Sequence, residues 1–155
     1  MTRPGLSLKA RALRYLAMRE HSRAELERKL ARHVDDDPED PAGPRIARVL
    51  DELASHGLID ERRAAEALVS AQSGRLGGLR LRQALRQRGV DAEAAEAALA
   101  GVADSELERA REVWRRRFGA PAADAAERAR QARFLAGRGF GGDVIRRVVR
   151  GLPDD

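Results

Sequence analysis

The stretch LASHGLIDERRAAEAL, residues 53–68, carries a short pattern that returns twice further along the chain. The later copies are LRQRGVDAEAAEAAL at residues 85–99 and LAGRGFGGDVIRRVV at residues 135–149. Each copy has a leucine, a glycine four residues later, an apolar residue and then an aspartate. Because internal repeats reflect repeated architecture, the three copies indicate a structural unit that is used several times.

Each landmark of this pattern has a local structural role. Glycine can adopt the left-handed backbone conformation that closes a helix C-terminus. The aspartate can cap the next helix by accepting hydrogen bonds from its free N–H groups. The pattern therefore predicts a turn between two helices at three glycine–aspartate pairs, which are Gly57 with Asp60, Gly89 with Asp91, and Gly139 with Asp143.

The remainder of the chain also has helical periodicity. Between Ile46 and Leu53 the apolar residues follow the i, i+3, i+4, i+7 template of an amphipathic helix, and no segment alternates with a period of two. Ser22 and Glu25 have the spacing of a capping box at the start of a helix. These patterns predict an all-α protein with about nine helices, among them helices over residues 7–20, 61–72 and 92–100.

Nine helices and repeated turns predict three tandem three-helix modules. The first covers residues 1–57 and includes an acidic, proline-containing loop at residues 35–44; the second covers 58–103 and the third 104–155. A unit of this size buries too little surface to be very stable alone. Neighbouring modules are therefore expected to support one another in an elongated and curved chain.

Composition excludes several classes of protein. The 155 residues are 43% hydrophobic but contain no run of 18 apolar residues, so no membrane span is expected. The N-terminal segment has no uninterrupted apolar stretch of the signal-peptide type. Cysteine is absent, so neither a disulfide framework nor a thiolate metal site is available. We expect a monomeric cytoplasmic protein.

No motif in the sequence predicts an enzyme, a cofactor or a bound metal. The histidines His21, His33 and His56 lack metal-ligand spacing and are expected to serve as favourable charges at helix ends. The segment SGRLGG at residues 73–78 lacks the GK[ST] ending of a phosphate-binding loop. The acidic loop lacks the ligand spacing of an EF-hand.

Arginine dominates the positive charge. Lysine occurs only at positions 9 and 29, so arginine supplies 28 of the 30 cations, and the net charge is +5. Guanidinium groups bind carboxylate and phosphate in a bidentate way. No acidic residue lies between Glu66 and Asp91, so the arginines there together favour an anionic partner, although a solvated polar face is the preferred explanation for any single one. The candidate contact residues are Gln83 and the arginines Arg75, Arg80, Arg82, Arg86, Arg88, Arg115, Arg116, Arg117, Arg146 and Arg147.

Four segments together resemble the RecX regulators of the bacterial recombinase RecA. They are ALRYLAMREHSRAELERKL (12–30), VLDELASHGLIDERRAAEALV (49–69), LGGLRLRQALRQRGV (76–90) and RFLAGRGF (133–140). The resemblance implies a non-enzymatic protein that binds the RecA–DNA filament in its groove and inhibits recombinase, ATPase and coprotease activities in DNA repair and the SOS response. Arg80, Arg82, Gln83 and Leu85 match the family motif of the middle module, whereas Gly78 and Ala84 depart from it.

Two other functional classes remain open. The glycine turns and the basic charge are also compatible with a helix-turn-helix protein that binds DNA directly. Against this, no single helix combines the Asn, Gln and Arg side chains of a base-reading recognition helix. Aromatic residues are only 3% of the chain, too few for a platform that stacks single-stranded bases. The repeats also permit a self-assembling scaffold.

Overall fold

A computed structural model describes residues 5–151, and over this range the chain is entirely helical apart from its connections. This confirms the predicted all-α class. The expected first and third modules include residues 1–4 and 152–155, which lie outside the described range. The described elements are α1 (Leu8–Met18), α2 (Arg23–Ala31), α3 (Ala42–Ser55), α4 (Glu61–Gln72), α5 (Gly78–Gln87), α6 (Ala92–Ala100), the short 3-10 helix η1 (Ala103–Ser105), α7 (Glu106–Arg117), α8 (Ala125–Gly137) and α9 (Gly142–Arg150).

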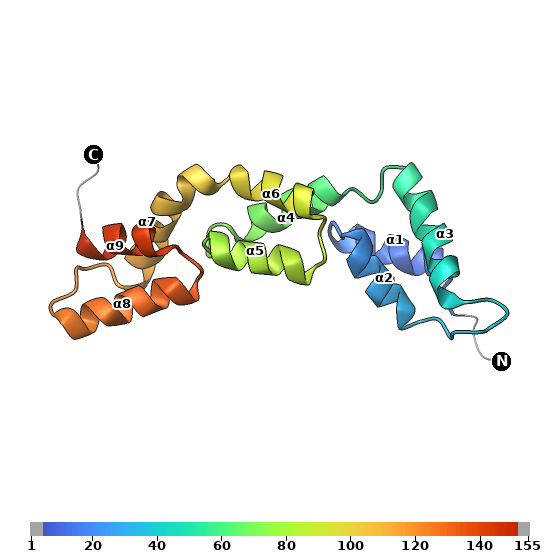
Figure 1. Cartoon of the computed structure of the whole chain (residues 1–155), viewed down its shortest axis with the longest axis horizontal. Coiled ribbons are helices and arrows are strands. Elements are labelled where there is room, and N and C mark those ends of the chain that lie inside the picture. Colours follow the sequence, from blue (N-terminus) through green and yellow to red (C-terminus); the bar gives the residue numbers. More distant parts are fainter. Residues whose placement is uncertain (1–4, 152–155) are drawn as a thin grey trace.

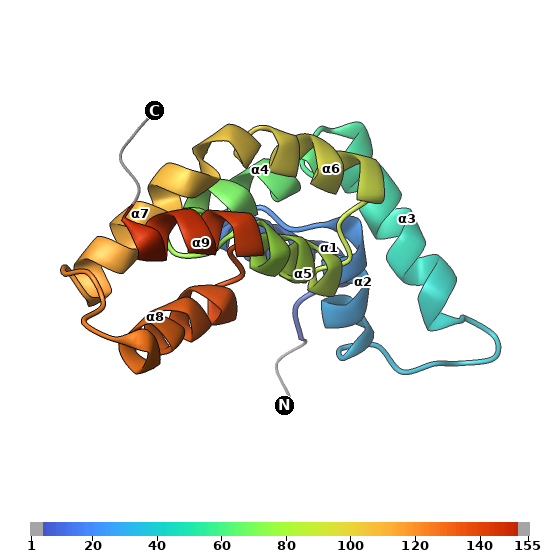
Figure 2. The same cartoon turned by 60° about the vertical axis from the view of Figure 1, so that its left-hand side comes forward.

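The helices form three bundles in a row. Figure 1 shows α1–α3, α4–α6 and α7–α9 following one another along an arched rod, and Figure 2 shows the bend of this rod from another side. The elongated and curved architecture predicted from the repeats is therefore confirmed. Among the described residues, no helix is long and apolar enough to cross a membrane.

Each bundle has a separate hydrophobic core. Leu26, Leu30 and Leu50 are fully buried in the first core, Leu81 in the second and Leu135 in the third. The first core also contains Ile59, which lies beyond the expected boundary between residues 57 and 58. The turn after α3 folds this residue back onto the helices that precede it.

The repeated turns adopt the expected conformation. The φ angles of Gly57, Gly89 and Gly139 are 73°, 65° and 90°, which lie in the left-handed region. The residue after each glycine donates its main-chain N–H to the leucine five positions earlier, at N–O distances of 3.0, 3.1 and 3.2 Å. This bond is characteristic of the Schellman motif. The side chains of Asp60 and Asp91 accept from N–H groups of the following helices, as predicted.

The third copy of the pattern departs from the prediction at Asp143. The N-cap of α9 is Gly141, and no side chain caps this helix. Asp143 lies inside the first turn and pairs with Arg146. In the second and third copies the cap comes two residues after the turn glycine, so Asp143, four residues after Gly139, comes too late to cap.

The second helices of the three bundles, α2, α5 and α8, are docked end to end, and we call them the central column (Figure 1). At the junction of α5 and α8, the N–H groups of Gly77 and Leu79 donate to the carbonyls of Arg138 and Gly139 at 2.8 and 3.1 Å. Free N–H groups at a helix start thus bind free carbonyls at a helix end. The helix dipoles are aligned head to tail across the junction.

At the junction between α2 and α5, donors at the start of one helix again bind carbonyls at the end of the other, but here the donors are side chains. Ser22, the N-cap of α2, donates its hydroxyl to the carbonyl of Arg88 at 2.5 Å. The Arg28 side chain donates to the carbonyl of Gln87 at 2.9 Å. Gln87 and Arg88 end α5, so the carbonyl groups at the end of one helix again bind the start of the next.

Glycine at position 77 allows the close approach of the second and third bundles. A Cβ atom there would lie 2.5 Å from the Gly139 carbonyl oxygen and 2.6 Å from the Phe140 Cα, both of which are main-chain atoms. Main-chain atoms cannot rotate out of the way as a side chain can. Gly77 itself has an ordinary φ of −82°, so its role is to leave space rather than to allow an unusual backbone conformation.

We predict that Gly77→Ala weakens this junction. The added methyl group forces the two main chains apart, and overpacking of this kind costs about 1–3 kcal/mol. Thermal unfolding and small-angle scattering measure the loss of stability and the change in shape. Gly74→Ala is the matched control, because a Cβ at Gly74 meets nothing within 4 Å. Equal stability and equal scattering of the two variants would show that close approach at Gly77 does not hold the bundles together.

Candidate functional site

The predicted contact arginines do not form one continuous surface, and several are paired with carboxylates. Arg115 and Arg116 both bind Glu112, at 2.7 and 3.0 Å. Arg146 binds Asp143 on the same helix. Helix neighbours three and four residues apart are placed to pair in this way. Their positive charge is therefore partly compensated.

The prediction that no carboxylate compensates the arginines of the middle segment is wrong for Arg82. Its guanidinium binds the Glu96 carboxylate in a two-point contact. Glu96 lies on α6, outside the acid-free segment in sequence but beside α5 in the fold. A segment without acidic residues can therefore still have carboxylates beside it in the folded protein.

The other predicted residues have different surroundings. The Arg80 side chain donates to the Gly137 carbonyl at 3.0 Å and so joins the second and third bundles. Arg86 and Arg147 are exposed, and no acidic partner binds either of them within the described range. The remaining predicted residues line two separate pockets. One pocket, where α2 meets α5, contains Gln83 and Arg88, and the other, where the α4–α5 loop meets α7 and α8, contains Arg75 and Arg117.

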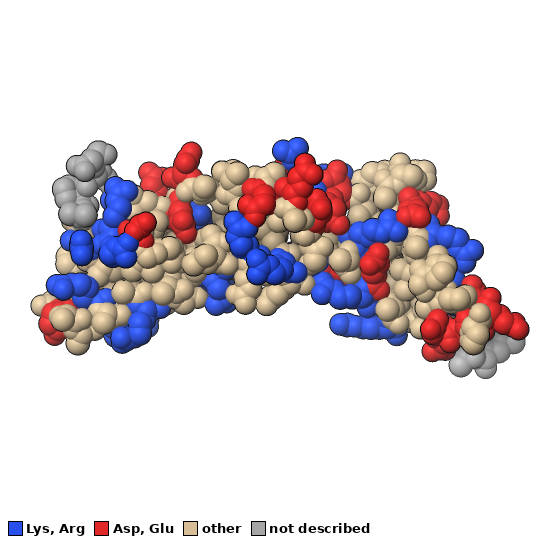
Figure 3. Space-filling model, in the orientation of Figure 1, with Lys and Arg blue, Asp and Glu red and all other residues tan. Residues whose placement is uncertain are grey.

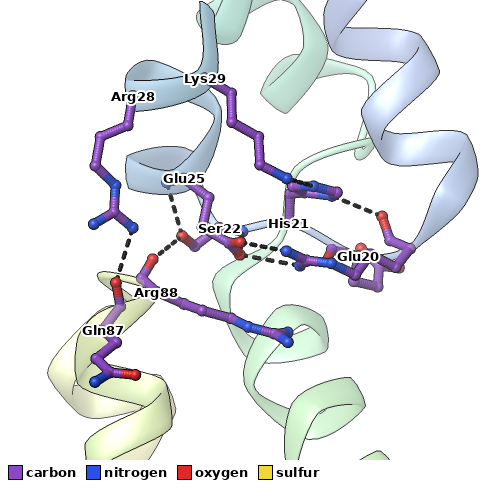
Figure 4. Close-up of polar contacts among 9 residues, drawn as sticks. Glu20, His21, Ser22, Glu25, Arg28, Lys29, Gln87 and Arg88 are labelled. Carbon is purple, nitrogen blue, oxygen red and sulfur yellow. Dashed lines mark hydrogen bonds and ion pairs between the residues drawn. The ribbon is translucent and has the colours of Figure 1, made fainter.

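A polar cleft of about 530 Å³ lies where α2 meets α5, and we call it the junction cleft. Figure 4 shows Ser22, Glu25 and Arg88 converging between α2 and the end of α5. The cleft has four arginines and one carboxylate, so its lining is strongly cationic. Its charged lining residues are Arg19, Arg28, Arg80, Arg88 and Glu25, and its amide side chains are Gln72, Gln83 and Gln87.

The single carboxylate of the cleft is already bound. Ser22 and Glu25 form the predicted capping box, with two bonds of 3.1 Å between side chain and main chain. Arg19 adds a two-point contact to the Glu25 carboxylate, at 2.6 and 3.3 Å. Burial alone would raise the pKa of Glu25, but the bonds from Arg19 and Ser22 outweigh it and hold the pKa below its usual value. Glu25 is therefore ionised, and it compensates Arg19.

Arg88 has no direct carboxylate partner in this cleft, and the charge of nearby Glu25 only partly offsets the effects of burial and of Arg19. Its guanidinium is half-buried and binds no acidic side chain among the residues described. Desolvation by burial, and then repulsion from Arg19, lower the pKa of Arg88. A cation that has lost water and gained a like-charged neighbour is stabilised by a bound anion. Arg88 can hold a phosphate or carboxylate group through charge-assisted hydrogen bonds.

His21 differs from the sequence expectation. It is 1% exposed rather than a charge at a helix end. Nδ1 lies 3.0 Å from the Arg19 carbonyl, and Nε2 lies 2.8 Å from Lys29 Nζ. Because a carbonyl only accepts and an ammonium group only donates, Nδ1 carries the proton and Nε2 accepts. Burial first, and then Arg19 and Lys29, lower the pKa of His21, so it packs as a neutral side chain.

The contribution of the first module to the cleft was not predictable from the sequence. Arg19 and Arg28 lie in a segment that also contains Glu20, Glu25 and Glu27, so no excess of charge was visible there. The capping box was the only local signal in this segment. It predicted the start of α2 but not the docking of α5 against it.

Charge is distributed unevenly over the rod. In Figure 3 acidic side chains gather over the edge formed by α4 and α6 and at the end that carries the α2–α3 loop. Basic side chains gather near α2 and α5 and over α7–α9 on the same face. A pocket between α4 and α6 is lined by one cation, Arg62, and by four carboxylates, of Asp60, Glu61, Asp91 and Glu93, so this edge is unfavourable for phosphate. Within residues 5–151 no group of acidic or histidine side chains has the geometry to hold a metal ion.

Three family models match the chain in the same order as its bundles. They are described as the first, second and third three-helix domains of RecX, and they match residues 9–38, 60–99 and 104–149. The chain is 53% identical to Regulatory protein RecX of Leptothrix cholodnii over 148 residues, which are 96% of this chain and 90% of that protein. The chain belongs to the RecX family. This confirms the resemblance found in the sequence.

Further comparisons agree with this RecX assignment. Regulatory protein RecX of Chromobacterium violaceum is 46% identical over 155 residues, covering 100% of this chain and 97% of that protein. A crystal structure of RecX from Lactobacillus salivarius has a TM-score of 0.75 and 22% identity, and the match covers 94% of each chain. At this identity the structural match supports the fold alone. The junction cleft thus lies between the regions that match the first and second RecX domains.

We predict that lowering the pH reduces the stability of the fold, partly through His21. Its pKa is lowered in the folded state from an ordinary value of 6.5, so only the unfolded chain takes up this proton as pH falls below 6.5. Proton uptake by the unfolded chain alone favours unfolding. Stability therefore decreases from about pH 6.5 toward the lower pKa of the folded state and is unaffected by this group above that window.

Denaturant unfolding at several pH values tests this prediction. His21→Gln removes the titrating ring and is expected to flatten the decrease between pH 7 and 5.5, although it lowers stability overall. His56→Gln is the matched control, because His56 is exposed, and it should keep the wild-type slope. If the two variants have the same pH slope, His21 is not held neutral by the fold.

Proposed function

We propose that this protein binds the RecA–DNA filament in its groove and inhibits the recombinase, ATPase and coprotease activities of RecA. It acts as a monomeric cytoplasmic regulator in DNA repair and the SOS response and catalyses no reaction itself. Membership of the RecX family supports this proposal. The observation that carries it is the arched rod of three separately packed bundles.

The rod suits a target that repeats at regular intervals. A compact domain contacts one subunit of a filament, whereas three bundles in a row can contact several neighbouring subunits at once. Linked contacts raise the effective concentration of each further contact, so weak individual contacts add up to firm binding. Such binding is lost when the filament disassembles. Inhibition then requires less than one regulator for each recombinase subunit.

The junction cleft supplies one of these contacts. Arg88 has no acidic hydrogen-bond partner in the described chain, and Arg28 lines the same cleft, where it binds the Gln87 carbonyl. The filament offers carboxylates on its protein subunits and phosphates on its DNA, and both are ligands for guanidinium groups. Both arginines are held by the junction of the first two bundles, so the site exists only when these bundles are docked.

Direct DNA binding by a helix-turn-helix motif is the second candidate. Exposed arginines with no acidic partner in the described part of the chain, Arg86 and Arg147, favour it. The helices after the glycine turns count against it. In a helix-turn-helix protein the start of such a helix contacts bases. Here α6 starts with Asp91 and Glu93, whose charge repels the DNA backbone. At the start of α4, Asp60 and Glu61 offset Arg62 and Arg63, so no net positive charge is left there.

We predict that the purified protein lowers the DNA-dependent ATPase and strand-exchange rates of RecA at amounts below one per recombinase subunit. Multivalent contact along the filament is the physical reason. The assay compares it with a basic helical protein of similar size and charge. Equal inhibition by this comparison protein would mean that charge alone acts and would contradict the proposal. Binding to naked DNA with a steep salt dependence and no effect on filaments would favour the second candidate.

We further predict that Arg88→Gln raises the concentration needed for half-inhibition about tenfold or more. A hydrogen bond to a charged group contributes about 1.5–3 kcal/mol, and tenfold corresponds to about 1.4 kcal/mol. Arg48→Gln is the matched control, because Arg48 is 73% exposed and lies 3.7 Å from its partner Asp40. Helix content is compared first by circular dichroism. If both variants inhibit like the wild type, the junction cleft does not contact the filament.

A further inference from the structure

Another pocket lies where the α4–α5 loop meets α7 and α8, and we call it the α7–α8 pocket. Its volume is about 260 Å³, and its apolar lining comes from Val113 and Phe134. Four arginines surround it, and none of its lining residues is acidic. A water molecule occupies about 30 Å³ in the liquid, so the pocket has room for a large side chain. The arginines are Arg75, Arg116, Arg117 and Arg138.

The aromatic residue holds two of these arginines in place. The guanidinium carbons of Arg117 and Arg138 lie 5.5 and 5.1 Å from the centre of the Phe134 ring. Phe118 packs edge-on against the same ring at 5.4 Å. Cation–π contacts of this kind orient a guanidinium without neutralising it. The charges of Arg117 and Arg138 therefore remain available to an anionic partner.

Most of the arginines around the pocket bind no carboxylate of the described chain. Of its four arginines only Arg116 binds a carboxylate in the described chain, that of Glu112 at 3.0 Å. Arg75 lies in the short loop after α4, where it is exposed. The result is an apolar hollow with an excess of positive charge around it. This combination differs from the junction cleft, which is lined by charged and amide groups.

We infer that the α7–α8 pocket receives one aliphatic or aromatic side chain of a partner protein, presented by a short segment with carboxylates on both sides of that residue. The apolar side chain fills the space against Val113 and Phe134, and the flanking carboxylates bind the surrounding guanidinium groups. Full burial of a side chain such as Leu or Phe contributes about 1.5–3 kcal/mol. The inference rests on the proposed function, because the partner segment belongs to a protein subunit of the filament.

A protein segment fits the pocket better than a nucleobase does. Every base has hydrogen-bond donors and acceptors on its edge, and burying them without partners is unfavourable. The lining has no amide, hydroxyl or carboxylate side chain to bind the donor groups of a base. Arginine offers donors only.

The first experiment measures the pocket chemistry without the filament. The probe is a fluorescein-labelled peptide with a central leucine and two glutamates on each side, and the full-length protein is titrated into it. The matching peptides have alanine at the centre or glutamines in place of the glutamates. Both changes are expected to weaken binding about tenfold. Equal binding of all three peptides overturns the inference, and so does displacement of the leucine peptide from this pocket by oligothymidylate.

The second experiment blocks the pocket by substitution. Gly74 lines it, and a Cβ there meets nothing within 4 Å, so Gly74→Trp places a large side chain at the pocket without a main-chain clash. Gly43→Trp is the matched control, because Gly43 also has nothing within 4 Å and lies in α3, at the other end of the rod. Gly74→Trp is expected to weaken both the binding of the leucine peptide and the inhibition of filaments about tenfold. Gly43→Trp is expected to leave both unchanged.

A charge reversal gives an independent variant. Arg75→Glu is expected to repel the glutamates of the probe and weaken its binding about tenfold, and Arg48→Glu in the first bundle is the control. If the wild type inhibits filaments and the pocket variants inhibit equally well, the inference is wrong while the proposed function stands. If the wild type has no effect on filaments, the proposed function is wrong, and the pocket loses its assigned partner even when the peptide binds.

Discussion

The structure depends on a main-chain contact between helix ends. The last carbonyls of α8 accept hydrogen bonds from the first N–H groups of α5, and a Cβ at Gly77 would lie 2.5 Å from one of those carbonyl oxygens. Every helix leaves such groups without partners at its two ends. Here the chain satisfies them by joining helices of successive bundles. The approach of the second and third bundles, and with it the position of the α7–α8 pocket, follows from this contact.

Arginine has two distinct uses in this chain. Some guanidinium groups hold the architecture together: Arg109 donates to the carbonyls of Ser73 and Leu76 at 2.7 and 2.6 Å, and Arg80 reaches the third bundle. Others, such as Arg88, face a pocket without an acidic partner in the described chain. The net charge of +5 therefore says little about the binding surface. Position relative to the bundle junctions distinguishes the two uses.

Local features of the fold were predictable, and contacts between distant segments were not. Glycine in a repeated context predicted the left-handed turns at Gly57, Gly89 and Gly139, because that conformation is a property of a single residue. The prediction that Asp143 caps α9 was wrong, because the spacing between glycine and aspartate differs in the third copy. The prediction that no carboxylate compensates Arg82 was wrong, because its partner Glu96 is 14 residues away in sequence and comes close only in the fold. The junction cleft needs Ser22 beside Arg88, and these are 66 residues apart.

The polar nature of the junctions has a consequence for their response to cold. Apolar surface dominates the positive heat-capacity change of unfolding, and hydrophobic stabilisation weakens on cooling. The three cores are separate clusters, whereas the junctions consist largely of main-chain and side-chain hydrogen bonds. The junction hydrogen bonds depend less on apolar burial than the cores do. Cooling is therefore expected to weaken the apolar packing inside the bundles more than the hydrogen bonds that join them.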